Sequence, residues 1–210
     1  MDQCGYKARS LQKIKRHWLP QFDWTSLEMV TPDIINEWSH GHNNTWSIRT
    51  DYPTPREYLP LFVHFKHSPE WTCIKARNMK KEDPAVSFVL SESTPPERVF
   101  FQAVFNYIQD MDMIAGEISL VKKPLRNCWT SEILIPFAID GGCYDYIKND
   151  KRILPCVDRL RRARQLTRGH EERMGFEMSC LTDGRLIFWE ITSNDMFKNY
   201  DSYVYLTKRE

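Results

Sequence analysis

The chain has 210 residues, of which 41% are hydrophobic, with 29 lysines and arginines against 28 aspartates and glutamates. This apolar content is enough for a buried core and excludes a globally disordered chain. The near-neutral charge excludes a polybasic tail as the organising feature, so affinity for a polyanion has to come from uneven placement of charge.

The six cysteines form no Cys-x-x-Cys pair, which argues against a zinc site and favours buried, reduced thiols. The N-terminal stretch lacks the apolar segment of a signal peptide. No run approaches the ~18 apolar residues that a membrane span needs. We therefore expect no transmembrane segment, a cytoplasmic or nuclear location, and no cofactor.

Two helices are predicted near the start of the chain. Residues 10–19 form a short basic helix whose apolar residues recur at helical spacing: Leu11, Ile14 and Trp18. Residues 31–41 form a second helix, because Thr31 is a good N-cap, proline follows at the first helical position and glycine ends the segment.

The pattern then changes to strands. Alternation of apolar and polar residues predicts strands at 46–52 and 59–65, and β-rich composition extends this prediction to 71–79 and 85–91. These segments are separated by turns rich in proline, aspartate and serine. Consecutive strands of this kind favour antiparallel pairing.

Residues 94–111 predict the clearest helix of the chain. Thr94 and Glu97 match a capping box, and a wide apolar stripe follows at helical spacing. The remaining elements are strands at 116–121 and 131–139, a helix at about 154–167, a hairpin over 175–192 and a strand at 200–207.

This order predicts an α+β fold, with mostly antiparallel sheets of about eight to ten strands covered by three or four helices. Because no linker divides the chain, residues 1–210 are expected to form a single globular domain. A basic helical arm occupies about residues 1–20.

The predicted helix at 154–167 and the turn after it are unusually rich in arginine. On a helical wheel the apolar residues gather on one side, and the solvent side is almost purely cationic. Like charges at this spacing cost stability unless an anion binds, and arginine matches phosphate geometry. The candidate phosphate-binding residues on this helix and the N-terminal helix are Lys13, Lys15, Arg16, Arg159, Arg161, Arg162, Arg164 and Arg168.

These charges favour a nucleic-acid-binding protein, with RNA preferred over DNA as its partner. Small size and high aromatic content suit an accessory or regulatory role, and a viral origin fits both. The alternative without nucleic acid is a structural or interaction protein whose basic face docks an acidic protein partner or a membrane surface.

The hairpin over 175–192 carries two facing carboxylates. Asp183-Gly184 predicts a two-residue type I′ turn. Counting outward from such a turn places Glu177 directly opposite Glu190. Like charges in that position are destabilising and call for a cation, so the pair is a candidate for a divalent-metal or acid–base site.

A hairpin with one acidic residue on each strand resembles the core of PD-(D/E)xK-type nucleases. The resemblance covers about twenty residues and implies a metal-dependent nuclease as a further alternative, with Glu177 and Glu190 as catalytic residues. The chain departs from that pattern in two places: no Pro-Asp begins the first strand, and Thr192 occupies the position of the motif lysine. Lys198 would have to supply the missing amine. The purely structural alternative is that one glutamate pairs with Arg173 or Arg185, or that a β-bulge shifts the register.

Overall fold

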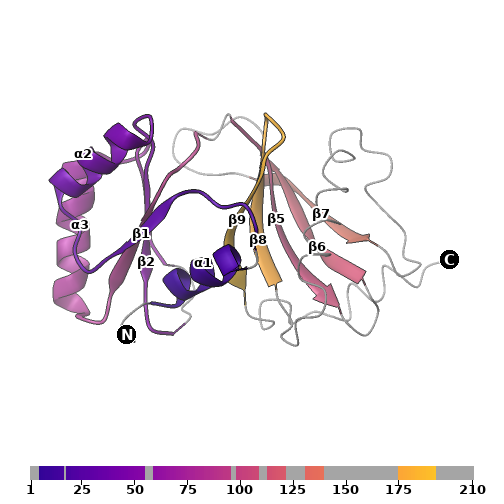
Figure 1. The fold of residues 1–210 in the computed structure, drawn as a ribbon, viewed down its shortest axis with the longest axis horizontal. Coiled ribbons are helices and arrows are strands. Elements are labelled where there is room, and N and C mark those ends of the chain that lie inside the picture. The colour runs from indigo at the N-terminus through magenta and orange to yellow at the C-terminus, as the bar shows by residue number, and fades with distance from the viewer. Residues whose placement is uncertain are drawn as a thin grey trace. The chain divides into compact units, whose positions relative to one another are not determined.

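The computed structural model describes residues 5–16, 18–54, 59–95, 98–108, 113–121, 131–139 and 175–192 (Figure 1). They belong to two compact units. The first comprises Met1–Lys13 and Phe22–Pro95, and the second comprises Ile14–Gln21 and Pro96–Glu210. The division into compact units does not test the prediction of a single globular domain with an N-terminal arm, which stays a prediction. No helix in the described ranges is long and apolar enough to cross a membrane.

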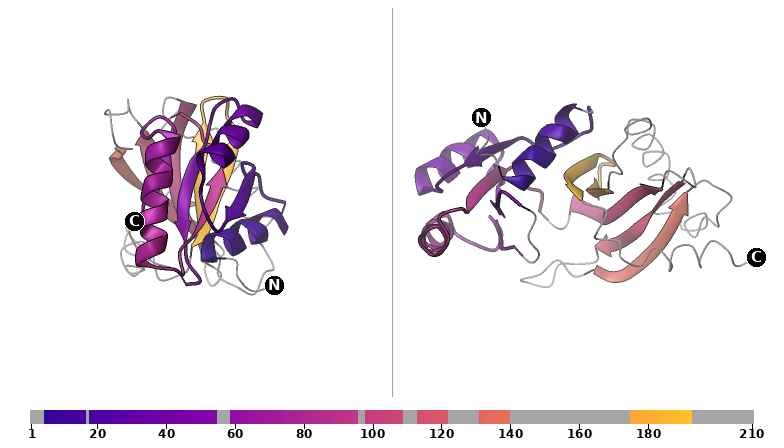
Figure 2. Two further views of the ribbon diagram at one scale, coloured as in Figure 1. Left: turned by 90° about the vertical axis from the view of Figure 1, so that its left-hand side faces the viewer. Right: turned by 90° about the horizontal axis from the view of Figure 1, so that it is seen from below.

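The first unit contains a four-stranded antiparallel sheet in the order β1-β4-β2-β3. Two helices, α2 and α3, lie side by side against one face of this sheet (Figures 1 and 2). The bounds are Trp24–Leu27 for β1, Ser47–Asp51 for β2, Leu61–Val63 for β3 and Ser87–Ser91 for β4, with Pro32–Gly41 for α2 and Pro69–Glu82 for α3.

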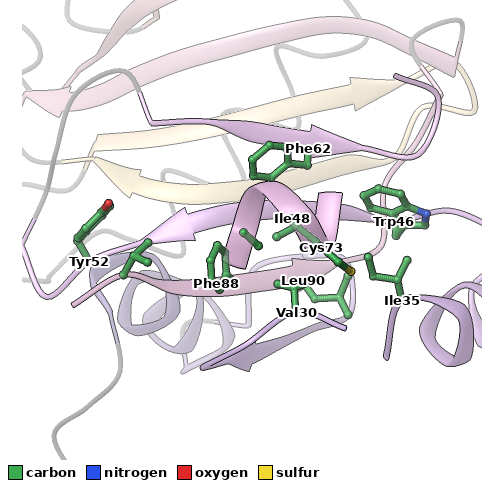
Figure 3. Close-up of a cluster of buried hydrophobic side chains, with 11 residues drawn as sticks. Val30, Ile35, Trp46, Ile48, Tyr52, Phe62, Cys73, Phe88 and Leu90 are labelled. Carbon is green, nitrogen blue, oxygen red and sulfur yellow. The ribbon is translucent and has the colours of Figure 1, made fainter. Parts of the chain in front are cut away.

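The core of this unit forms where the helices meet the sheet (Figure 3). Ile35 of α2 and Cys73 of α3 pack with Ile48 of β2 and with Phe88 and Leu90 of β4. All five side chains are buried. Burial of this apolar surface is the main force that holds helices against a sheet.

Local signals located α2 correctly. Thr31 Oγ1 accepts a hydrogen bond from the Ile34 amide at 3.3 Å, and proline occupies the start of the helix. This side-chain cap satisfies one of the amides that a helix N-terminus leaves without a partner.

The strand predicted at 71–79 is wrong, because these residues lie in α3. Ser68 caps this helix by accepting a bond from the Trp71 amide at 3.2 Å, with proline directly after the cap. Thr72, Cys73 and Ala76 are buried at helical spacing. These residues are small, so the apolar stripe is weak in the sequence and the cap is the stronger signal.

The N-terminal helix α1 (Tyr6–Arg16) is tied to β2 by a buried carboxylate. Asp51 accepts hydrogen bonds from the amides of Lys7 at 2.7 Å, Ala8 at 2.9 Å and its own neighbour Tyr52 at 2.9 Å. A Cβ atom on Gly5 would overlap the Asp51 carboxylate, so the close approach needs glycine at that position.

The helix α1 ends in a Schellman motif with tryptophan in the place that glycine usually takes. Leu19 N donates to Ile14 O at 3.2 Å and Trp18 N donates to Lys15 O at 3.1 Å. Trp18 has a φ of 57° and is 88% exposed. The prediction that Trp18 joins the apolar stripe is therefore wrong, whereas Leu11 and Ile14 are buried as expected.

The second unit contains a five-stranded antiparallel sheet in the order β7-β6-β5-β8-β9. Figure 2 shows the yellow hairpin of β8 and β9 continuing this sheet beside β5. The bounds are Val99–Ile108 for β5, Met113–Val121 for β6, Ser131–Ile139 for β7, Gly175–Leu181 for β8 and Leu186–Thr192 for β9.

The helix predicted at 94–111 is wrong, because Val99–Ile108 is the central strand of this sheet. This strand carries a nearly continuous apolar run, VFFQAVFNYI. Such a run does not alternate, so it also matches the spacing of a helix. Aromatic and β-branched residues dominate this segment, and that composition favours the strand.

The predicted α+β class with antiparallel sheets is confirmed. The predicted strands at 116–121 and 131–139 are confirmed as parts of β6 and β7. The arginine-rich helix at 154–167 and the strand at 200–207 lie outside the described residues.

Candidate functional site

The β8–β9 hairpin closes through a loop of three residues, Thr182 to Gly184. Leu181 N donates to Arg185 O at 2.8 Å, and Gly184 N donates to Leu181 O at 2.8 Å. Gly184 has a φ of 83°, the left-handed conformation that such a loop requires at its last residue. The predicted two-residue type I′ turn is therefore wrong.

The longer loop shifts the strand register by one residue. Cys180 faces Leu186, Ser179 faces Ile187 and Met178 faces Phe188. A two-residue turn would have placed each of these β8 residues opposite the next residue of β9.

A β-bulge at Trp189 then restores the register. Between Met178 and Glu177 the pairing shifts again, so that Glu177 faces Glu190 and Trp189 is the extra residue. The predicted pairing of the two glutamates is confirmed, although the predicted turn was wrong, because the loop and the bulge cancel.

A partly buried side-chain hydrogen bond lies beside the bulge. Trp189 Nε1 donates to Ser179 Oγ at 2.6 Å, and Ser179 is only 1% exposed. The indole and the hydroxyl therefore lie on the same side of the hairpin as Glu177, two residues from Ser179 along β8. Leu186 to Trp189 are all apolar, so the sequence of β9 has no alternation that could have located this bulge.

Glu177 and Glu190 are both half-buried. Directly opposite positions on antiparallel strands bring Cβ atoms to about 4.5–5.5 Å. Two carboxylates this close, partly withdrawn from water, are stabilised by a cation or a shared proton. Their partial exposure leaves them reachable by a ligand.

The described residues do not form a complete metal site. Among them, no three histidine, cysteine, aspartate or glutamate side chains lie close enough together to bind an ion. The glutamate pair can supply two of a metal's ligands. The remaining ligands would have to come from water or from a bound molecule.

The other predicted site residues are not brought to this hairpin by anything that the structure describes. Lys13, Lys15 and Arg16 are exposed on α1. The five arginines of the predicted phosphate-binding helix lie outside the described residues, as does Lys198. The predicted basic strip thus stays a prediction.

No protein-family model matches the sequence, and no curated protein matches it either. Solved structures do match the fold. Carboxyaminoimidazole ribonucleotide synthase from Aspergillus clavatus, complexed with ATP, aligns with a TM-score of 0.54 and 12% identity over 90% of this chain and 44% of its own. The same enzyme with ADP and 5-aminoimidazole ribonucleotide gives a TM-score of 0.53 at 12% identity over the same shares.

A second enzyme gives the same result. D-alanyl-alanine synthetase A from Vibrio cholerae aligns with a TM-score of 0.50 and 8% identity, over 91% of this chain and 56% of its own. The chain therefore has the fold of part of these two enzymes, and it spans about half the length of each.

This fold corrects the predicted function. The prediction of an RNA-binding accessory protein is wrong, and so are the nuclease and interaction-protein alternatives, because the solved structures that share this fold are a synthase complexed with ATP and a D-alanyl-alanine synthetase. The physical reason is that a run of arginines indicates affinity for some anion, and it carries no information about the fold that bears it.

Proposed function

We propose that this chain is the nucleotide-binding part of an ATP-dependent ligase of the ATP-grasp class. The support is its fold, which it shares with a synthase complexed with ATP and with a second ATP-dependent ligase. We assign the proposed function to particular residues because Glu177 pairs directly with Glu190 on adjacent strands.

A facing carboxylate pair fits the metal that accompanies ATP. Mg²⁺ prefers oxygen ligands and is usually bound by one or two carboxylates together with phosphate oxygens and water. The hairpin offers two carboxylates, and the nucleotide and water would supply the other ligands. This division also explains why the described residues contain no complete metal cage.

In this role Glu177 and Glu190 would bind the metal. The bound metal would neutralise charge on the nucleotide phosphates during transfer of a phosphoryl group. The glutamates themselves would orient the metal and, through it, fix where the phosphates lie on the sheet. The same carboxylate pairing suggested a nuclease in the sequence, and the fold favours the ligase.

Nucleotide binding tests the proposal. Titration calorimetry of the full chain with ATP, with Mg²⁺ and then with EDTA, separates metal-dependent from metal-independent affinity. Glu177→Gln and Glu190→Gln keep the side-chain shape and remove one charge each. We expect each to weaken binding of Mg²⁺-ATP at least tenfold, with little effect on binding of ATP in EDTA.

Asp183→Asn is the matched control. Asp183 is an exposed carboxylate at the tip of the same hairpin, where it accepts bonds from Arg185 Nε at 2.8 Å and Arg185 N at 2.9 Å. Its neutralisation should leave Mg²⁺-ATP affinity unchanged. If the wild-type chain binds no ATP, or if all three variants bind as the wild type does, the proposed function is wrong.

The compartment that we propose is the cytoplasm or the nucleus. The two cysteines in the part of the chain that the structure describes, Cys73 and Cys180, are buried thiols and not disulfides. This state supports a reducing environment, in which disulfides are rare.

A further inference from the structure

We infer that the hydrogen bond from Trp189 to Ser179 positions Glu190 for metal binding, by holding the β-bulge that brings the two glutamates together. The inference rests on the proposed function, because it assigns a positioning role relative to the metal ligands named there. The evidence lies in the register of the hairpin.

Without the bulge the two carboxylates would not share a face. If the register set by the three-residue loop continued, Trp189 would face Glu177 and Glu190 would face Phe176. Neighbouring residues of a strand point to opposite sides of a sheet, so Glu190 would then lie on the other face from Glu177. The extra residue at position 189 is therefore required for the carboxylate pair.

The bulge persists although it brings the like charges of Glu177 and Glu190 together. A regular ladder would separate Glu177 from Glu190 and relieve the repulsion between like charges. It would also regain the backbone pairing that a bulge interrupts. Two features oppose this slip.

The first feature is the apolar character of the opposite face. Met178, Cys180 and Phe188 are buried there. A carboxylate placed beside them would lose water without gaining a partner of its own, which is unfavourable. This cost keeps the Glu190 side chain off the opposite face of the sheet. It does not determine where Glu190 lies relative to Glu177.

The second feature is the hydrogen bond of Trp189, which determines where Glu190 lies relative to Glu177. In the regular register the indole would stand directly opposite Glu177. With Nε1 bonded to Ser179 Oγ at 2.6 Å, the ring is drawn toward Ser179 and leaves the place opposite Glu177 to Glu190. Because Ser179 is 1% exposed, water cannot readily replace the bond if it is removed.

Ser179→Ala removes the acceptor and Trp189→Phe removes the donor while keeping an aromatic ring. Ser179→Thr retains the hydroxyl on a residue that strands favour. We expect both deletions of the bond to weaken Mg²⁺-ATP binding about tenfold, and Ser179→Thr to remain close to the wild type. Binding of ATP in EDTA should be unaffected in all three variants.

A second measurement reports on the bond itself. In ¹⁵N NMR spectra of the full chain, the indole N–H of Trp189 is the resonance lost in Trp189→Phe. We expect it to be protected from hydrogen exchange in the wild type and in Ser179→Thr, and to exchange quickly in Ser179→Ala.

Ser68→Ala is the control for a general loss of stability. It removes a serine hydrogen bond at the N-terminus of α3, in the other unit, and leaves the hairpin unchanged. It should lower thermal stability without changing Mg²⁺-ATP affinity.

The outcomes separate the two ideas. If Glu177→Gln and Glu190→Gln bind Mg²⁺-ATP as the wild type does, the proposed function fails and the positioning role fails with it. If those variants lose affinity but Ser179→Ala and Trp189→Phe do not, only the positioning inference is overturned. It is also overturned if Ser68→Ala loses as much affinity as Ser179→Ala.

Discussion

Replacement of Asp51 by alanine should destabilise the first unit strongly. The carboxylate is 1% exposed and accepts three backbone N–H groups, from Lys7, Ala8 and Tyr52. Two of these donors, on Ala8 and Tyr52, belong to buried residues that water reaches poorly. A buried donor without its acceptor costs about 1–3 kcal/mol, and the third bond is an N-terminal cap of α1, worth about 1 kcal/mol.

The expected loss of unfolding free energy for Asp51→Ala is therefore about 3–7 kcal/mol. Asp51→Asn keeps one oxygen in place of two and sets an amide against a backbone donor, so we expect about half of that loss. Urea titration followed by circular dichroism measures both values. Hydrogen exchange at the amides of Lys7 and Ala8 locates the effect.

A loss below about 1 kcal/mol for Asp51→Ala would refute this reasoning. Unchanged protection of the Lys7 and Ala8 amides would refute it as well, because the carboxylate would then not be their essential acceptor.

Three further changes test other parts of the fold. Trp18→Gly should stabilise the chain by about 0.5–1 kcal/mol in urea titration, because Trp18 is exposed and its left-handed backbone strains any residue with a Cβ; Trp18→Ala keeps the Cβ, and an equal gain there would contradict the explanation. Burial, and secondarily Lys66, lower the pKa of His67 below its usual 6.5. The unfolded chain therefore binds the proton more readily, so stability from this group is present above about pH 6.5 and declines as the pH falls further. His67→Phe should make the unfolding free energy less pH-dependent between pH 7 and 5, and an unaltered profile would count against the assignment. Ser68→Ala should cost about 1 kcal/mol by loss of the cap on α3, and a thermal midpoint equal to that of the wild type would exclude a stabilising cap.

The charge pattern was the least reliable guide to function. Six arginines in a short segment suggested a polyanion partner, but such a run of charge does not determine the fold of the chain that contains it. The pairing of the two carboxylates was the better structural prediction, because it depends on residues close together in one hairpin. Even there, the pairing of Glu177 with Glu190 was predicted from a turn that the chain does not form.

Features with a local cause could be predicted from the amino-acid sequence alone. The α2 helix follows from Thr31 and the proline after it, and the hairpin follows from Asp183-Gly184 between two β-rich segments. That Val99–Ile108 is a strand depends on tertiary pairing: one neighbour in the sheet is the next strand, Met113–Val121, but the other is Gly175–Leu181, far along the chain. The tertiary structure also decided which face Glu190 occupies. A single extra residue in a strand reverses every later side chain, and backbone pairing across the sheet determines where that residue sits.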